Sequence, residues 1–199
     1  FSGIAYAEYL QKKIFTPLGM KDTLFGVPPA VADRFATLYN VGKEGALQPQ
    51  QTEGYARYTT RAFATLSLSG STGDYLKFAQ MLLNKGELDG RRYLGRKTVE
   101  LMTSNHLKGD MADMGMPRFS ESPYYGIGFG LGFSVMINPA KAQILGTAGE
   151  YAWGGAASTA FWCDPAEDMA VVLLTQLYPS STYPIRRDLR VLTYQAIVD

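Results

Sequence analysis

The sequence is short of metal-binding and disulfide-forming residues. Cys163 is the only cysteine, so no intrachain disulfide can form within these 199 residues. It lies in a short aromatic run that favours a strand, where a small thiol is usually buried and unreactive. His106 is the only histidine and lies far from Cys163 in the sequence, so the two residues form no zinc-ligand cluster. We therefore expect neither a metal nor another cofactor.

Net charge and long apolar runs are also scarce. The 19 basic and 18 acidic residues are scattered and leave a formal net charge of +1. This balance predicts no basic face for nucleic acid. The longest purely aliphatic run, Ala170 to Leu174, is too short to cross a bilayer. With 46% hydrophobic residues the chain can bury a sizeable core, so we expect one globular domain that acts on a small molecule.

Apolar residues at helical spacing predict four helices. The first ends before Pro17, and Ser71-Thr72-Gly73-Asp74 fits a capping box ahead of the second. His106 follows the third, a position more typical of a helix cap or surface residue than of a catalytic base. The predicted helices run from Ile4 to Phe15, from the capping box to about Leu82, from Arg96 to Ser104 and from Pro184 to Val198.

Two segments with little periodicity are predicted to be loops. Residues 26–65 are rich in Gly, Pro, Gln, Tyr and Thr, which predicts long loops and short strands over a site. Tyr39, Tyr55 and Tyr58 are candidates for a pocket lining, although such tyrosines more often pack their rings with the hydroxyl in water. The Met-rich segment 109–122 is either core filler or a mobile loop with an adaptable apolar rim for substrates.

The last third of the chain has the patterns of a β-sheet. Asp164 to Asp168 has turn chemistry and joins two strand-like runs, Thr159 to Cys163 and Met169 to Gln176, into a hairpin. Two further strands are expected from Tyr124 to Ile137 and from Gln143 to Thr147. Together with the terminal helix, strands near 130, 145, 160 and 173 predict an α/β fold, an α+β sandwich with an antiparallel sheet and packed helices.

Glycine at every second position from 126 to 132 leaves one face of the expected strand without side chains. A bare face suits close packing against another layer better than it suits phosphate binding.

A glycine pair, Gly154-Gly155, stands where a strand is predicted to begin. Glycine weakens a strand and is tolerated there for a bulge, or because another group must come close to the backbone. In the second case the exposed strand amide of Ala156 would be the kind of donor that stabilises an oxyanion in acyl transfer. The residues alone leave both interpretations open.

The segment from Gly149 to Gln176 resembles the C-terminal part of the serine β-lactamase and penicillin-binding-protein superfamily. The nearest resemblance is to the family VIII carboxylesterases of its class-C-like branch, in which Trp-Gly-Gly stands where β-lactamases carry Lys-Thr-Gly. Two more blocks resemble the superfamily in the same order: Pro17-Leu18-Gly19-Met20, and the helix from Asp74 to Leu83 with the turn Gly86 to Gly90. The resemblance implies a β-lactamase/transpeptidase-like fold that is incomplete in this chain.

Two motifs of that superfamily are missing. No lysine has a serine three residues before it, and no Tyr-x-Asn occurs. In the family, both motifs lie upstream of the Pro-Leu-Gly-Met block, which here begins within the first twenty residues. We therefore expect residues 1–199 to be the C-terminal portion of a single catalytic domain, loop- and helix-rich over about 26–122, with the sheet and terminal helix in 123–199. The serine nucleophile and its base would come from the N-terminal part of the same enzyme.

The resemblance implies a serine hydrolase that cleaves short-chain esters through an acyl-enzyme. Ala156 would provide an oxyanion N–H, and the substrate would contact Tyr151, Trp153, Gly154 and Gly155. An indole in place of the family's lysine offers an apolar wall and one N–H donor, which favours neutral esters over β-lactam carboxylates. The alternatives are a β-lactamase or D-alanyl peptidase, and, in another class, a non-catalytic penicillin-binding-like module.

Overall fold

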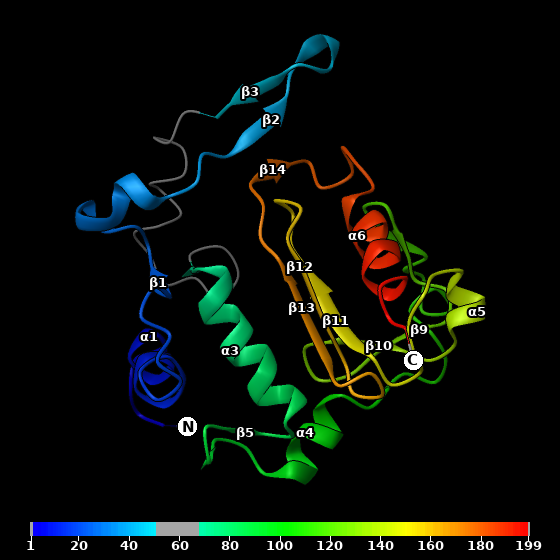
Figure 1. Cartoon of the computed structure of the whole chain (residues 1–199), viewed down its shortest axis with the longest axis horizontal. Coiled ribbons are helices and arrows are strands. Elements are labelled where there is room, and N and C mark those ends of the chain that lie inside the picture. The colour runs from blue at the N-terminus through cyan, green and yellow to red at the C-terminus, as the bar shows by residue number, and fades with distance from the viewer. Residues whose placement is uncertain (1, 51–67, 199) are drawn as a thin grey trace. The chain divides into compact units, whose positions relative to one another are not determined.

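The computed structural model describes residues 2–50 and 68–198, which form two compact units, Phe1–Phe78 and Ala79–Asp199. Figure 1 shows their helices and strands. The boundary between the units falls within helix α3 (Thr72–Leu83).

The first unit consists of short elements. The predicted first helix is present as α1 (Tyr6–Leu10), continues as a π-helical turn, η1 (Gln11–Phe15), and ends before Pro17. The expected loops and short strands follow in the described part of 26–65. Tyr39 is 40% exposed, and Tyr55 and Tyr58 lie outside the described residues. The other elements are β1 (Leu24–Phe25) paired with β4 (Leu68–Ser69), β2 (Tyr39–Val41) paired with β3 (Leu47–Pro49), η2 (Pro29–Arg34) and η3 (Lys43–Gly45).

Of the two reciprocal hydrogen bonds of a capping box, the described residues ahead of α3 form one. Ser71 Oγ accepts the Asp74 amide at 3.3 Å, as a cap should. The buried Asp74 carboxylate does not reach back to the cap. It instead accepts the Asp22 amide at 2.7 Å and the Thr23 hydroxyl at 3.1 Å. This carboxylate therefore ties the chain after the Pro-Leu-Gly-Met block to the first turn of α3.

The second unit is built on a five-stranded antiparallel sheet of order β13-β12-β11-β10-β9. The predicted hairpin is confirmed as its last two strands, and its turn contains Asp168 at φ +47°. The strands are β9 (Ile127–Phe129), β10 (Ser134–Met136), β11 (Tyr151–Gly154), β12 (Ala160–Asp164) and β13 (Met169–Leu173).

The strand expected at Gln143 to Thr147 is wrong, and the strand expected at Tyr124 to Ile137 is instead the hairpin β9–β10. A short helix, α5 (Pro139–Ala142), precedes the first of these segments, and the Asn138 side chain caps it by accepting the Lys141 amide at 3.0 Å. Gln143 at φ +54° and Gly146 at φ +150° then turn the chain away from extended geometry. The strand forms later, as β11.

The bare glycine face packs closely, as predicted. A Cβ at Gly128 would clash with the Asn105 side chain, and one at Gly130 would clash with the Met102 carbonyl. Met102 is the last residue of helix α4 (Arg96–Met102), and Asn105 lies in the connection that follows it. His106, from the same connection, places Nε2 2.8 Å from the Leu101 carbonyl, so it caps α4 as expected.

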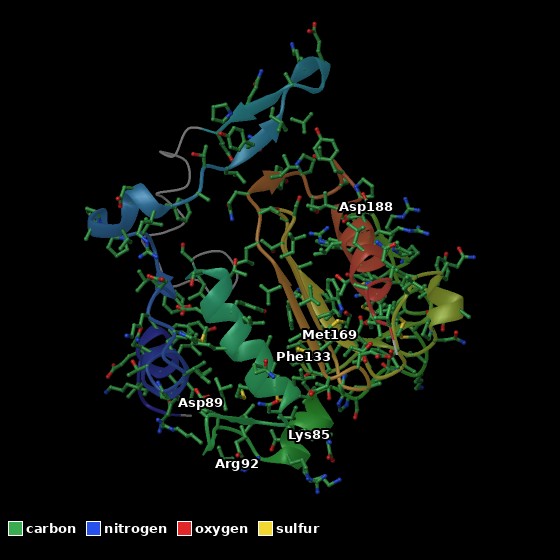
Figure 2. The ribbon with its side chains drawn as sticks, viewed as in Figure 1. Lys85, Asp89, Arg92, Phe133, Met169 and Asp188 are labelled. Atoms are coloured by element: carbon green, nitrogen blue, oxygen red, sulfur yellow. The ribbon has the colours of Figure 1, made fainter. Side chains whose placement is uncertain are left out.

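The turn after α3 is a tight hairpin. β5 (Glu87–Leu88) and β6 (Arg91–Arg92) are joined by Asp89 and Gly90, both at positive φ, as in a type I′ turn. Asp89 and Arg92 are labelled in Figure 2.

The Met-rich segment is anchored by Asp110. This buried carboxylate accepts the Gly126 amide at 2.7 Å and pairs with Lys141 Nζ at 2.7 Å. These contacts hold the pKa of Asp110 well below its usual range. Met111 is buried, whereas Met114 and Met116 are each 52% exposed, so this segment combines core filler with exposed apolar side chains. A small hairpin, β7 (Arg118–Phe119) and β8 (Ser122–Pro123), forms its C-terminal end.

The terminal helix α6 (Ile185–Tyr194) lies along one face of the sheet, as predicted, although it ends four residues before Val198 (Figure 1). The Arg190 guanidinium stacks on Trp162 of β12, 4.6 Å from the ring centroid. Strand β14 (Leu177–Tyr178) precedes the helix. None of the helices in the described residues is both long and apolar enough to cross a membrane.

Cys163 is fully buried on β12. The expectation of a buried cysteine is confirmed, and burial raises the pKa of its thiol to about 12.

Candidate active site

The Trp153-Gly154-Gly155 triplet ends a strand. Gly154 is the last residue of β11, where it pairs with Ala160, and residues 155–159 turn the chain into β12. The expectation that the glycine pair opens a strand is therefore wrong, and Ala156 is an exposed turn residue, not a strand residue. The reason is that β11 pairs with both β10 and β12, a tertiary arrangement that the local pattern does not contain.

Close approach to the backbone explains the glycine pair. A Cβ at Gly154 would lie 2.9 Å from the Thr159 carbonyl oxygen and 3.3 Å from Arg186 Nε. A Cβ at Gly155 would clash with the Thr159 hydroxyl. Of the two interpretations open from the sequence, the structure therefore favours close approach over a bulge. The approaching groups are a residue of the same turn and an arginine of α6.

The turn is held by its carbonyl groups. The Gly155 amide donates to the Thr159 carbonyl at 3.1 Å, and the Ser158 amide donates to the Gly155 carbonyl at 3.1 Å. The Ala157 carbonyl accepts the Thr175 hydroxyl at 2.9 Å. Within the described residues, the Ala156 N–H donates to no backbone carbonyl. The Ala156 amide therefore belongs to an exposed residue on an anchored turn.

Trp153 and Tyr151 have different environments. Trp153 is 39% exposed and packs edge-to-face on Phe129, with ring centroids 5.2 Å apart. Tyr151 is only 2% exposed, and its ring lies 5.5 Å from that of Phe133, which Figure 2 labels. Burial raises the pKa of Tyr151. The structure therefore places Trp153, Gly154, Gly155 and Ala156 together at the strand end, while the Tyr151 side chain packs in the sheet with almost no surface for a substrate.

A small cavity of about 120 Å³ lies between the sheet and α6. Its walls include Ala152, Trp162 and Arg190. Ligand sites for drug-sized molecules enclose at least about 300 Å³, so this cavity is too small for such a ligand. Among the residues that the structure describes, no group of three or more His, Cys, Asp or Glu side chains is placed to hold a metal.

Arg186 and Glu121 are site residues that the sequence analysis missed. Arg186 Nη2 donates to the Gly155 carbonyl at 2.6 Å, and Nε donates to the Thr159 carbonyl at 3.1 Å. Glu121 accepts two hydrogen bonds from Arg186 Nη1, at 2.8 and 2.9 Å, and a third from the Ser120 hydroxyl. One sequence signal could have indicated Arg186. Because Arg186 and Arg190 are four residues apart, they share a face of the predicted helix.

The comparisons with known proteins agree with this architecture. Residues 2–195 match the Beta-lactamase family. Protein Rv1367c of Mycobacterium tuberculosis (strain ATCC 25618 / H37Rv) is 32% identical over 178 residues, which are 86% of this chain and 43% of that protein. This chain thus spans less than half the length of that relative.

Two solved structures share the fold. Simvastatin synthase (LovD) from Aspergillus terreus has a TM-score of 0.79 at 23% identity, over 94% of this chain and 48% of that one. EstCE1, described as a hydrolase with promiscuous acyltransferase activity, has a TM-score of 0.73 at 23% identity, over 96% of this chain and 50% of that one. The β-lactamase/transpeptidase-like fold is therefore present in part, as expected, and the chain belongs to the Beta-lactamase family.

Proposed function

We propose that this chain is the C-terminal part of a single catalytic domain, that of a serine hydrolase which cleaves short-chain carboxylic esters through an acyl-enzyme. The observation that carries the proposal is the amide of the exposed residue Ala156, which donates to no backbone carbonyl of the described residues and lies on an anchored turn. In acyl transfer, such an amide stabilises the negative charge that develops on the carbonyl oxygen. The nucleophilic serine and its base would come from residues upstream of Phe1.

Trp153 supports a neutral substrate. Its indole is partly exposed, packs on Phe129 and stands next to the glycine pair, so it offers an apolar wall beside the proposed oxyanion donor. A lysine there would attract a carboxylate, whereas an indole does not. Gly154 and Gly155 let Thr159 and Arg186 come close to the backbone at this strand end, and Tyr151 supports the strand by packing on Phe133.

The test uses the complete polypeptide that contains this sequence. We expect it to hydrolyse p-nitrophenyl butyrate, to react with a fluorophosphonate at one serine, and to gain the mass of one butyryl group when the reaction is quenched early. A larger kcat/KM for a cephalosporin than for the ester would favour the β-lactamase alternative. Absence of both labelling and turnover would support the non-catalytic module. The 199-residue chain alone should show no burst, because it contains no Ser-x-x-Lys.

Replacing Trp153 with lysine should change substrate selectivity. A partly exposed ion pair contributes on the order of 1 kcal/mol, so the ratio of kcat/KM for a carboxylate-bearing β-lactam to kcat/KM for a neutral ester should rise about fivefold. Trp153→Phe is the matched control, because it keeps an apolar ring without adding charge. An unchanged ratio in Trp153→Lys would remove Trp153 from the substrate site.

A further inference from the structure

We propose that Arg186 is a positioning residue that orients and polarises the Ala156 N–H through the Gly155–Ala156 peptide. The contact between Arg186 and the Gly155 carbonyl is present in the structure, and its effect on catalysis rests on the proposed function. The key contact joins Arg186 Nη2 to the Gly155 carbonyl oxygen at 2.6 Å.

The contact acts on the donor because both groups belong to one peptide unit. The Gly155 carbonyl and the Ala156 N–H are rigidly coupled by the planar amide, and in a trans peptide they point in opposite directions. A carbonyl held toward α6 therefore directs the N–H away from α6. A positively charged donor on the carbonyl also draws electron density from the amide, which strengthens the N–H as a donor.

The guanidinium is itself fixed in place. Arg186 and Glu121 are paired through two hydrogen bonds, and their side chains are only 11% and 13% exposed. Arg186 Nε donates to the Thr159 carbonyl, which also accepts the Gly155 amide. Arg186 thus holds both ends of the turn that carries Ala156.

The glycine at position 154 makes this approach possible. A Cβ there would lie 3.3 Å from Arg186 Nε, which is closer than most side-chain contacts, and 3.6 Å from Nη2, which is an ordinary contact distance. The planar fork of an arginine is needed to reach two carbonyls and a carboxylate together, whereas an ammonium group is a compact point charge. We therefore expect lysine to replace Arg186 only partly.

The experiment measures the peptide and the chemistry separately in the complete polypeptide. Carbonyl ¹³C of Gly155 and amide ¹⁵N of Ala156 report the hydrogen bond by NMR, while kcat, KM and affinity for butylboronic acid report catalysis. Arg186→Gln should move both resonances, lower kcat about tenfold and weaken boronate binding by a similar factor, since a charge-assisted hydrogen bond contributes roughly a factor of ten. KM should change less than twofold, and Arg186→Lys should be intermediate.

Two variants make the test specific. Arg187→Gln removes the exposed neighbouring charge on the same helix and should change neither the resonances nor kcat. Glu121→Gln keeps Arg186 but loosens it, so it should move the same resonances with about a two- to threefold loss in kcat. This second variant also keeps the proposal testable if Arg186→Gln does not fold.

A double variant separates this inference from the proposed function. If Arg186 acts through the Ala156 N–H, Arg186→Gln should have almost no further effect on kcat in an Ala156→Pro background. Full additivity, or a loss of kcat without movement of the two resonances, would overturn the positioning role and leave the proposed function intact. An Ala156→Pro enzyme with parental kcat would instead remove the oxyanion assignment, and with it the catalytic consequence proposed for Arg186.

Discussion

Replacing Ala156 with proline in the complete polypeptide is expected to lower kcat about 100- to 1000-fold, with a much smaller change in KM. Proline lacks the N–H that we assign to the oxyanion, and loss of one such donor removes about 3 to 4 kcal/mol of transition-state stabilisation. The ground-state ester gains little from the same donor, which is why KM should be less affected.

The turn position makes this substitution a clean test. Ala156 lies outside the strands, so proline breaks no ladder hydrogen bond. Its φ is not among the positive values, and the preceding Gly155 tolerates the restriction that proline imposes on its neighbour. Ala156→Gly keeps the N–H and is the matched control. A thermal melt and fluorophosphonate labelling would establish that the variant folds, and a folded variant within a few-fold of the parental kcat would refute the oxyanion assignment.

Replacing Glu150 with glutamine is expected to destabilise the folded state by about 3 to 5 kcal/mol, the usual effect of breaking a buried ion pair. The Glu150 side chain is 3% exposed and pairs with Arg190, which is 11% exposed. The Tyr194 hydroxyl lies 2.8 Å from Glu150 Oε2 and 2.6 Å from Asp164 Oδ2, and its single proton can be donated to only one of these carboxylates. Without the carboxylate, the Arg190 guanidinium would remain buried against Trp162 without its counter-charge.

Urea unfolding of the complete polypeptide measures this loss. Arg190→Met should be destabilising as well, whereas the double variant Glu150→Gln, Arg190→Met should recover part of the loss, because no unpaired charge remains. Asp188→Asn, at an exposed position of the same helix labelled in Figure 2, should change stability by less than about 0.5 kcal/mol. A loss below about 1 kcal/mol in Glu150→Gln would contradict the importance of the pair.

The elements that could be predicted are those whose signals are local. Two apolar runs flank Asp164-Pro165, and this pattern specifies the β12–β13 hairpin without reference to the rest of the chain. The start of α3 was also predictable, because a cap and its helix are neighbours in sequence. The placement of β11 could not be predicted from the sequence. Its four residues include Trp153 and Gly154 without clear alternation, and pairing with strands on both sides decides their conformation.

By itself, the sequence determined the Trp-Gly-Gly motif, the terminal helix over the sheet and the glycine face that packs without side chains. Only the tertiary structure decided what the glycine pair accommodates. Arg186 donates a hydrogen bond to the Gly155 carbonyl, 31 positions earlier in the sequence, and Arg190 pairs with Glu150, 40 positions earlier. Such contacts depend on how a helix docks on a sheet, and docking is set by the packing of whole surfaces. Local spacing therefore shows that two arginines share a helix face, but not which carbonyls and carboxylates they contact.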